Sequence, residues 1–367
     1  MDNAIAELEH SDRICQISLS YLTTSQIETL CTTMQVPFPE LELLVLLFET
    51  EHVPVLPNSF LGGSAPRLRF LCLTAIPFPG LPNLLLSTTH LHTLWLIKMP
   101  HSGYISPDAM VTCLSMLTGL HSFRLEFESP QSCPDQETRS SPPLSRFILP
   151  VLSSFSFKGV NEYLEDLVSQ IDAPQLYELL ISLFNDIHFD TPELNQFISR
   201  TLTLGTYDQA FLTFHSRQAE VELMSHHSYG RVNVSILCQV PDWQLSSLAQ
   251  ICNSSLHLLL TMEDLYIQEE LFSPSDWKDD IENTEWLDLL LPFTAVKNLY
   301  LSKIFAPRIA PALQELTGRR TTEVLPALQK VCLEKFLPSE HVQEGIARFI
   351  SARQLANHTI AVSHWNR

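Results

Sequence analysis

A short phrase, apolar-x-x-apolar-x-apolar, recurs along the chain and constrains its fold more than any other feature. The copies with a proline two residues ahead begin at Leu41, Leu68, Leu152, Leu176 and Leu328. The copies without that proline spacing begin at Ile14, Leu91, Leu120, Met262 and Val296. The starts at 14, 41, 68, 91, 120, 152 and 176 are 27, 27, 23, 29, 32 and 24 residues apart. This period indicates one short structural unit repeated many times.

Stretches with apolar residues at helical spacing separate these phrases. Two of them open with Ser106-Pro107 and Thr191-Pro192, which favour helix starts because the hydroxyl accepts from a free N–H group and proline presets φ. A strand followed by a helix, repeated, requires parallel strands. The sequence therefore predicts an α/β fold, a leucine-rich-repeat solenoid or horseshoe, with one curved, mainly parallel sheet and helices on its convex side.

We expect a single leucine-rich-repeat domain over residues 1–367, with three local features. Residues 129–143 are polar and proline-rich, which predicts a mobile loop insertion inside one repeat. Residues 207–240 alternate in strand fashion where the repeat phrase is poor, which predicts an irregular or hairpin-like β insertion. Residues 339–367 are expected to form a C-terminal capping helix and strand that close the end of the core.

Charge and composition narrow the partner classes. The net charge of −19 argues against nucleic acid or an anionic membrane as the main partner, because neither offers positive charge. The first ten residues are acidic and do not resemble a signal peptide, and no stretch of about 18 apolar residues is present. We expect an intracellular protein, cytoplasmic or nuclear, whose eight cysteines are free thiols.

The concave face of the sheet is the candidate binding site. Side chains alternate along a strand, so if Leu94 and Leu96 face the core, Trp95 faces away from it. The same argument gives a predicted apolar surface in the second to fourth repeats, made of Leu43, Val45, Leu47, Phe70, Trp95 and Ile97. A second, more polar surface contains Tyr266 and Tyr300 with Asp264 and Asn298. The alternation also places Cys72 and Cys332 on this face.

Two other interpretations of the apolar surface remain open at this point. A loop or an N-terminal segment could cover it. The register could also slip by one residue in the leucine-dense repeat at Leu41, and a slip of one residue exchanges the inward and outward sets. If neither holds, burying such a surface against a partner recovers about 25 cal/mol per Å².

No pattern in the chain indicates catalysis or a metal. His90-x-His92 and His226-His227 have no Cys or carboxylate at metal-site spacing, and no Cys–His signature points to a nucleophile. The Leu61-Gly62-Gly63-Ser64 stretch lacks the Lys-Ser/Thr of a phosphate loop. We therefore predict no catalytic residue, no metal site and no cofactor, and we expect that the protein is not an enzyme.

From about residue 240 onward the chain resembles a particular family. The stretches 242–255, 262–267 and 292–302 are similar to the C-terminal repeats of F-box-associated leucine-rich-repeat proteins of mushroom-forming fungi. In members with an F-box, that N-terminal module docks on a Skp1-type adaptor of a ubiquitin ligase and the repeats recognise the substrate. No Leu-Pro-x-Glu phrase precedes the first repeat strand at Ile14 here, so a Skp1-type adaptor is not expected to bind this chain.

These observations together predict a non-enzymatic protein–protein interaction scaffold. The resemblance implies substrate recognition of the kind performed by the repeat half of an F-box ubiquitin-ligase subunit. The alternative is a small-GTPase regulator or a structural scaffold of leucine-rich-repeat type, for which Arg124 is the arginine predicted on the concave face. The expected partner is a protein, whose identity the sequence does not give.

Overall fold

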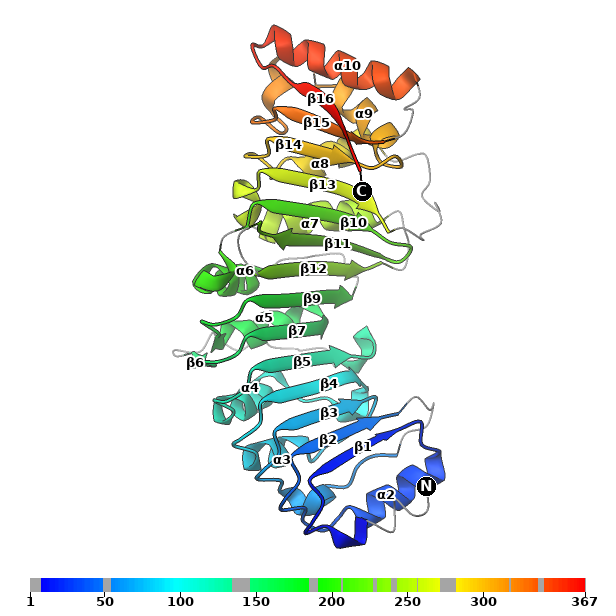
Figure 1. Ribbon diagram of the computed structural model, residues 1–367, viewed down its shortest axis with the longest axis vertical. Coiled ribbons are helices and arrows are strands. Elements are labelled where there is room, and N and C mark those ends of the chain that lie inside the picture. Colours follow the sequence, from blue (N-terminus) through cyan, green and yellow to red (C-terminus); the bar gives the residue numbers. More distant parts are fainter. Residues whose placement is uncertain are drawn as a thin grey trace. The chain divides into compact units, whose positions relative to one another are not determined.

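The computed structural model describes residues 8–48, 54–133, 146–184, 191–205, 207–226, 230–238, 243–255, 257–270, 282–316, 318–335 and 340–366. Within these residues the chain is mixed α/β, with nine α-helices and a mostly parallel sheet of 14 strands (Figure 1). Contacts divide the chain into two compact units, Met1–Leu180 with Gln196–Thr203, and Ile181–Asn195 with Leu204–Arg367. The expectation of one domain over residues 1–367 stays a prediction.

In the first unit the strands of the large sheet follow chain order, while β6 (Phe147–Ile148) and β8 (Ile171–Asp172) pair with each other in a separate two-stranded sheet. The order in the large sheet is β1-β2-β3-β4-β5-β7-β9, and the pairs from β1 to β7 are parallel. The strands are β1 (Gln16–Ser20), β2 (Leu43–Leu47), β3 (Phe70–Thr74), β4 (Thr93–Met99), β5 (Ser122–Phe127), β7 (Ser154–Gly159) and β9 (Glu178–Phe184). The helices are α2 (Thr24–Thr33), α3 (Leu81–Ser87), α4 (Pro107–Met116) and α5 (Asn161–Ser169), while α6 (Pro192–Arg200) has residues in both units.

The second unit continues from the last part of β9 and breaks this sequential order. Its strands follow the order β9-β12-β11-β10-β13-β14-β15-β16, with β10–β11 and β11–β12 antiparallel and the pairs from β10–β13 to β15–β16 parallel. The strands are β10 (Gln209–Phe214), β11 (Gln218–Met224), β12 (Arg231–Leu237), β13 (Asp264–Glu269), β14 (Asn298–Leu301), β15 (Lys330–Glu334) and β16 (Ala361–Trp365). The helices are α7 (Gln244–Ser255), α8 (Asn283–Leu290), α9 (Ala306–Gln314) and α10 (Glu340–Leu355).

The repeat phrase forms the strands because its apolar positions face a packed interior. In β2 the burial alternates residue by residue, with Leu44 and Leu46 buried and Leu43, Val45 and Leu47 half-buried. The residues predicted to be buried are buried: Leu71, Leu73, Leu94, Leu96, Leu179, Leu299 and Leu301. This alternation excludes a one-residue slip of β2.

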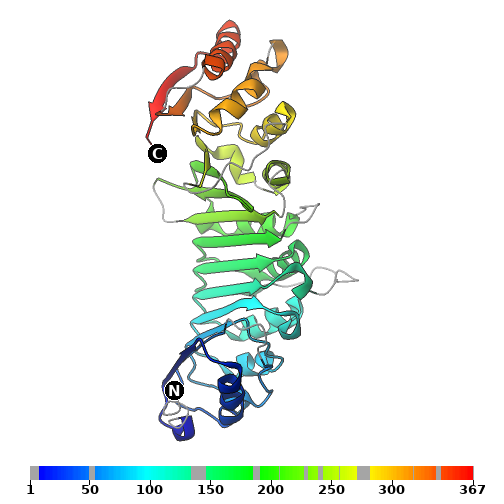
Figure 2. The ribbon, with the colours of Figure 1, turned by 90° about the vertical axis from the view of Figure 1, so that its right-hand side faces the viewer.

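Helices begin where the sequence supplies caps. The Ser106 side chain accepts a hydrogen bond from the Ala109 N–H at 3.3 Å and Pro107 is the first residue of α4. Thr23 and Gln26 form a capping box at the start of α2. In each unit the helices that the structure describes lie on one face of the sheet (Figure 2). We call the side chains that point away from the helices the open face.

Some features expected in the sequence fall partly outside the described residues. Of the loop expected at 129–143, Pro130–Ser132 form a short 3-10 turn and residues 134–143 lie outside the described range. The range 207–240 contains β10, β11 and β12, and the range 339–367 contains α10 and β16.

Candidate functional site

The apolar patch of the first unit consists of Leu43, Val45, Leu47, Phe70, Trp95 and Ile97. The parallel register brings these residues together across three adjacent strands. Leu43 of β2 pairs with Phe70 of β3. Cys72 of β3 pairs with Val45 on one side and with Trp95 on the other. In the same way Thr74 pairs with Leu47 on one side and with Ile97 on the other. All six patch residues are half-buried, so each keeps part of its surface exposed on the open face. The structure thus places the six predicted residues on the same face of three adjacent strands.

Trp95 is held in a fixed orientation within this patch. Its indole Nε1 donates a hydrogen bond to Ser122 Oγ at 3.0 Å. Its ring packs edge-to-face against Phe70, with 5.3 Å between the ring centroids. An aromatic side chain that is already ordered loses little conformational entropy on binding, which favours Trp95 as a binding anchor.

Polar residues border the apolar patch on both sides. Gln16 and Ser18 of β1 lie beside Leu43 and Val45. On the β5 side Arg124 pairs with Trp95 in the register, and its Nε donates to Glu126 Oε1 at 2.6 Å. An apolar centre with a polar rim is the usual composition of a protein–protein interface.

An aromatic row crosses the open face of the second unit. It contains the predicted residues Tyr266 and Tyr300 and extends to Phe211, all at matched register positions of β10, β13 and β14. The rings are stacked, with centroids 4.4 Å apart for Phe211 and Tyr266 and 4.1 Å apart for Tyr266 and Tyr300. Trp365 of β16 packs edge-on against both tyrosines, at 5.8 and 5.7 Å. Both faces of the Tyr266 ring are therefore covered, by Phe211 and Tyr300.

Polar groups fix the ends of this aromatic row. Gln209 Nε2 donates to the Tyr266 hydroxyl at 3.3 Å, and Asn298 Nδ2 donates to Asp264 Oδ1 at 2.7 Å. Burial raises the pKa of Tyr266 and of Tyr300 above the ordinary value of 10. Both hydroxyls therefore stay protonated at neutral pH and can donate as well as accept.

Two cysteines predicted on the open face are in fact buried. Cys72 occupies an outward register position but is only 4% exposed, and it lies between the larger Val45 and Trp95. Cys332 is 2% exposed, between Tyr300 and Ser363, whose hydroxyl is 3.2 Å from its sulfur. Larger neighbours cover a small side chain, which alternation alone does not take into account.

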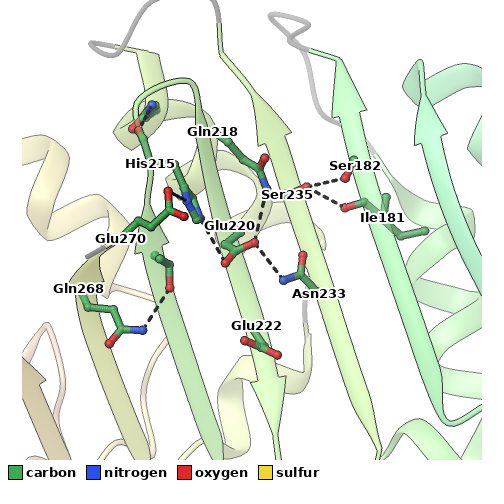
Figure 3. A network of polar contacts seen from close by, with 12 residues as sticks. Ile181, Ser182, His215, Gln218, Glu220, Glu222, Asn233, Ser235, Gln268 and Glu270 are labelled. Atoms are coloured by element: carbon green, nitrogen blue, oxygen red, sulfur yellow. Dashed lines mark hydrogen bonds and ion pairs between the residues drawn. The ribbon is translucent and has the colours of Figure 1, made fainter. Parts of the chain in front are cut away.

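A polar network around the turn between β10 and β11 was not predicted from the sequence (Figure 3). His215 Nδ1 lies 2.8 Å from Glu270 Oε2 and His215 Nε2 lies 3.3 Å from Glu220 Oε1. Glu220 Oε2 also accepts from Asn233 Nδ2 at 3.1 Å. The contact with Glu220 is the largest cause that raises the pKa of His215; burial opposes it and Glu270 adds to it.

Three open-face residues of the second unit were missed for a common reason. Phe211, Arg231 and Trp365 lie in strands that do not carry the repeat phrase. Alternation of apolar residues around Phe211 was the available signal, but it does not show which strands become neighbours. Arg231 pairs with Glu222, so Arg124 is joined by a second open-face arginine.

The described residues contain no group of three or more His, Cys, Asp or Glu that could hold a metal ion. All eight cysteines are free. His92 and His121 are exposed neighbours with their Nδ1 atoms 3.4 Å apart, and His227 lies outside the described residues. Among the helices that the structure describes, none combines the length and the apolar composition needed to cross a membrane.

The similarity of this chain to known proteins is confined to its resemblance to solved structures. No family model matches the chain, and no curated protein matches it. One solved structure that is similar is the leucine-rich-repeat-containing protein LegL7 from Legionella pneumophila. The two sequences are 10% identical, the match covers 91% of this chain and 96% of that one, and the TM-score is 0.31. A score this low does not establish a shared fold.

Proposed function

We propose that the chain is a non-enzymatic protein-interaction scaffold of the leucine-rich-repeat type, and that the apolar patch on β2, β3 and β4 binds a protein partner. One observation carries the proposal: three adjacent parallel strands present half-buried apolar side chains on the face without helices. Exposing such a surface has a solubility cost, and contiguous apolar patches of this kind mark interaction sites.

The leucine-rich-repeat interpretation rests on the repeat itself. The phrase recurs at 23 to 32 residues, and its copies from Ile14 to Leu176 coincide with consecutive strands of the first unit. A repeat that exposes one strand face per unit builds an extended binding surface from short pieces. We further propose, from the resemblance to the repeat half of F-box proteins, that the partner is a substrate of ubiquitination.

The alternative of a small-GTPase regulator has less support. A regulator that supplies an arginine to a nucleotide needs that guanidinium to be available. Arg124 is paired with Glu126 at 2.6 Å, and Arg231 is paired with Glu222. Neither arginine favours this role.

Replacing Trp95 by alanine tests the proposed function. We expect Trp95→Ala to weaken partner binding by at least about 2 kcal/mol, the usual size of a tryptophan hot spot. The thermal midpoint should change little, because Trp95 is half-buried and lies outside the leucine core. Binding is measured by quantitative affinity purification with the tagged full chain, followed by titration of each recovered protein.

A matched tryptophan provides the control. Trp243 is 50% exposed and lies just ahead of α7, in the second unit. Trp243→Ala should leave both partner binding and the thermal midpoint unchanged. A large drop in the midpoint of Trp95→Ala without a specific binding defect would show that Trp95 is part of the core or is covered, and the proposed site would be wrong.

A further inference from the structure

The turn between β10 and β11 contacts a residue that is distant in the sequence. His215 is the first residue of this turn, and its backbone N–H donates to the Gln218 carbonyl at 2.8 Å. Its two ring nitrogens face two different carboxylates, Glu220 of β11 and Glu270 directly after β13 (Figure 3). Glu270 is 55 residues away in the chain. The imidazole thus bridges two segments that meet only through folding.

The two contacts differ in kind: Nδ1 is within hydrogen-bond geometry of Glu270, whereas Nε2 faces Glu220 at 3.3 Å as a charge contact without hydrogen-bond geometry. A neutral imidazole has one N–H group and one acceptor nitrogen, whereas the imidazolium has two N–H donors. Only the protonated ring therefore turns an N–H group and a positive charge toward both Glu220 and Glu270. In the neutral ring one nitrogen presents a lone pair to a carboxylate, which is repulsive.

The Glu220 and Glu270 carboxylates differ in how firmly other groups hold them beside His215. The Glu220 side chain is 17% exposed and is also held by Asn233 Nδ2 and by Gln218 Nε2 at 3.4 Å. The Glu270 side chain is 56% exposed, and water can solvate it once His215 releases it. From α7, the neutral Gln244 donates its Nε2–H to the His215 carbonyl at 2.8 Å. Arg231 of β12 is the further charge that acts on Glu220.

We propose that His215 is a pH-operated latch that fastens the β10–β11 turn to the end of β13. In the closed state the imidazolium bridges Glu220 and Glu270. In the open state the neutral ring has one N–H group and no charge, so it no longer holds both carboxylates. The latch lies at the end of the strands that carry Phe211 and Tyr266, with the Thr213–Gln268 hydrogen bond of 3.3 Å between them. Opening it removes the side-chain link between the turn and β13 beside the aromatic row, while the backbone bond from the Glu270 N–H to the Phe214 carbonyl at 3.0 Å remains.

The direction in which the latch responds to pH follows from the titration of one imidazole, His215, and one carboxylate, Glu220. The pKa of His215 is raised above 6.5, so its contribution is complete below pH 6.5 and is lost as pH rises through the raised pKa. Burial acts to raise the pKa of Glu220, but His215, Asn233 and Arg231 outweigh it and hold that pKa below 4.5. Protonation of the Glu220 carboxylate, which would weaken the latch, therefore occurs only at a pH below 4.5. The latch is closed between these limits and opens on the alkaline side.

Hydrogen–deuterium exchange of the full chain tests the latch directly. Uptake is measured by mass spectrometry at pH 5.5 and 8.5 for peptides covering 209–220 and 264–270, and is corrected for the intrinsic rate at each pH. In the unmodified chain we expect protection of both peptides to fall severalfold between pH 5.5 and 8.5. His215→Gln should remove this difference, because glutamine does not titrate.

Two further variants make the outcome decisive. His226→Gln is the matched control, because His226 also faces a carboxylate, Asp264 at 3.6 Å, and it should keep the pH difference. Glu270→Gln keeps the shape of the side chain and removes its charge, so it should reduce the difference. The proposal is overturned if His215→Gln, or Glu270→Gln where His215→Gln does not fold, shows the same pH difference as the unmodified chain. Equal protection of the unmodified chain at both pH values would also overturn it.

Discussion

Leu46 and Leu47 are adjacent leucines in β2 that allow a controlled test of the alternation. Leu46 is 0% exposed and lies in the core ladder between Leu19 and Leu73. Leu47 is half-buried on the open face, between Ser20 and Thr74. Because the residue type and the substitution are the same, Leu46→Ala and Leu47→Ala differ only in the face of the sheet that each side chain occupies.

The expected costs follow from burial. Leu→Ala removes three carbon atoms, and a fully buried methylene is worth about 0.8 kcal/mol, so Leu46→Ala loses about 2.4 kcal/mol of transfer free energy. The cavity that remains adds to this, which brings the expected loss to about 3 to 5 kcal/mol. Leu47→Ala leaves no closed cavity, so we expect it to lower the free energy of unfolding by roughly 1 kcal/mol or less.

Urea unfolding followed by circular dichroism measures both variants. Hydrogen exchange of peptides from β1 to β4 assigns the loss to the first unit rather than to the whole chain. Equal losses for the two variants, or a larger loss for Leu47→Ala, would refute the assignment of the two faces. The proposed apolar patch would then fail with it, since it depends on the same alternation.

Further substitutions give independent checks. Gly159→Ala should destabilise the first unit, because an added Cβ would lie 2.6 Å from the Phe157 ring and 2.9 Å from the Phe127 ring; thermal unfolding measures this. Arg353→Met should lower the thermal midpoint, because Arg353 is 0% exposed and donates to the Val324 and Leu325 carbonyls, and of these, within the residues that the structure describes, only Leu325 keeps another donor, the Leu328 N–H at 3.1 Å; an unchanged midpoint would refute this role. Ser106→Ala should cost about 1 kcal/mol through loss of the α4 cap, read from urea unfolding. Purified protein should carry no stoichiometric zinc by elemental analysis, and a 1:1 content would overturn the expectation of no metal site.

Much of the first unit could be predicted from sequence because its structure is local. Each repeat phrase supplies one strand, consecutive strands pair in parallel, and the register then follows from the alignment of the phrases. Val45, Cys72 and Trp95 occupy equivalent positions in three phrases and are paired in the structure. The position of these half-buried apolar side chains on one face is therefore a direct consequence of the repeat.

The second unit was less predictable because its strand order differs from the chain order. Strand β12 follows β9 in the sheet, and β10 pairs with β13, so neighbours are set by long-range contacts. The pairing of His215 with Glu270 and the stacking of Phe211 on Tyr266 both depend on this rearrangement. No spacing rule within the sequence relates residues brought together in this way.

Photo-crosslinking from the apolar patch is the most direct test of the claim that β2, β3 and β4 bind a protein partner. A photoreactive benzoylphenylalanine is introduced at Val45, on the open face, and separately at Met116, which is 48% exposed at the end of α4. Our account predicts a discrete crosslinked protein from Val45→benzoylphenylalanine that is absent from Met116→benzoylphenylalanine. Excess unmodified chain should compete for it, and excess Trp95→Ala chain should not. Equal yields from both positions, or no adduct from position 45, would contradict the claim.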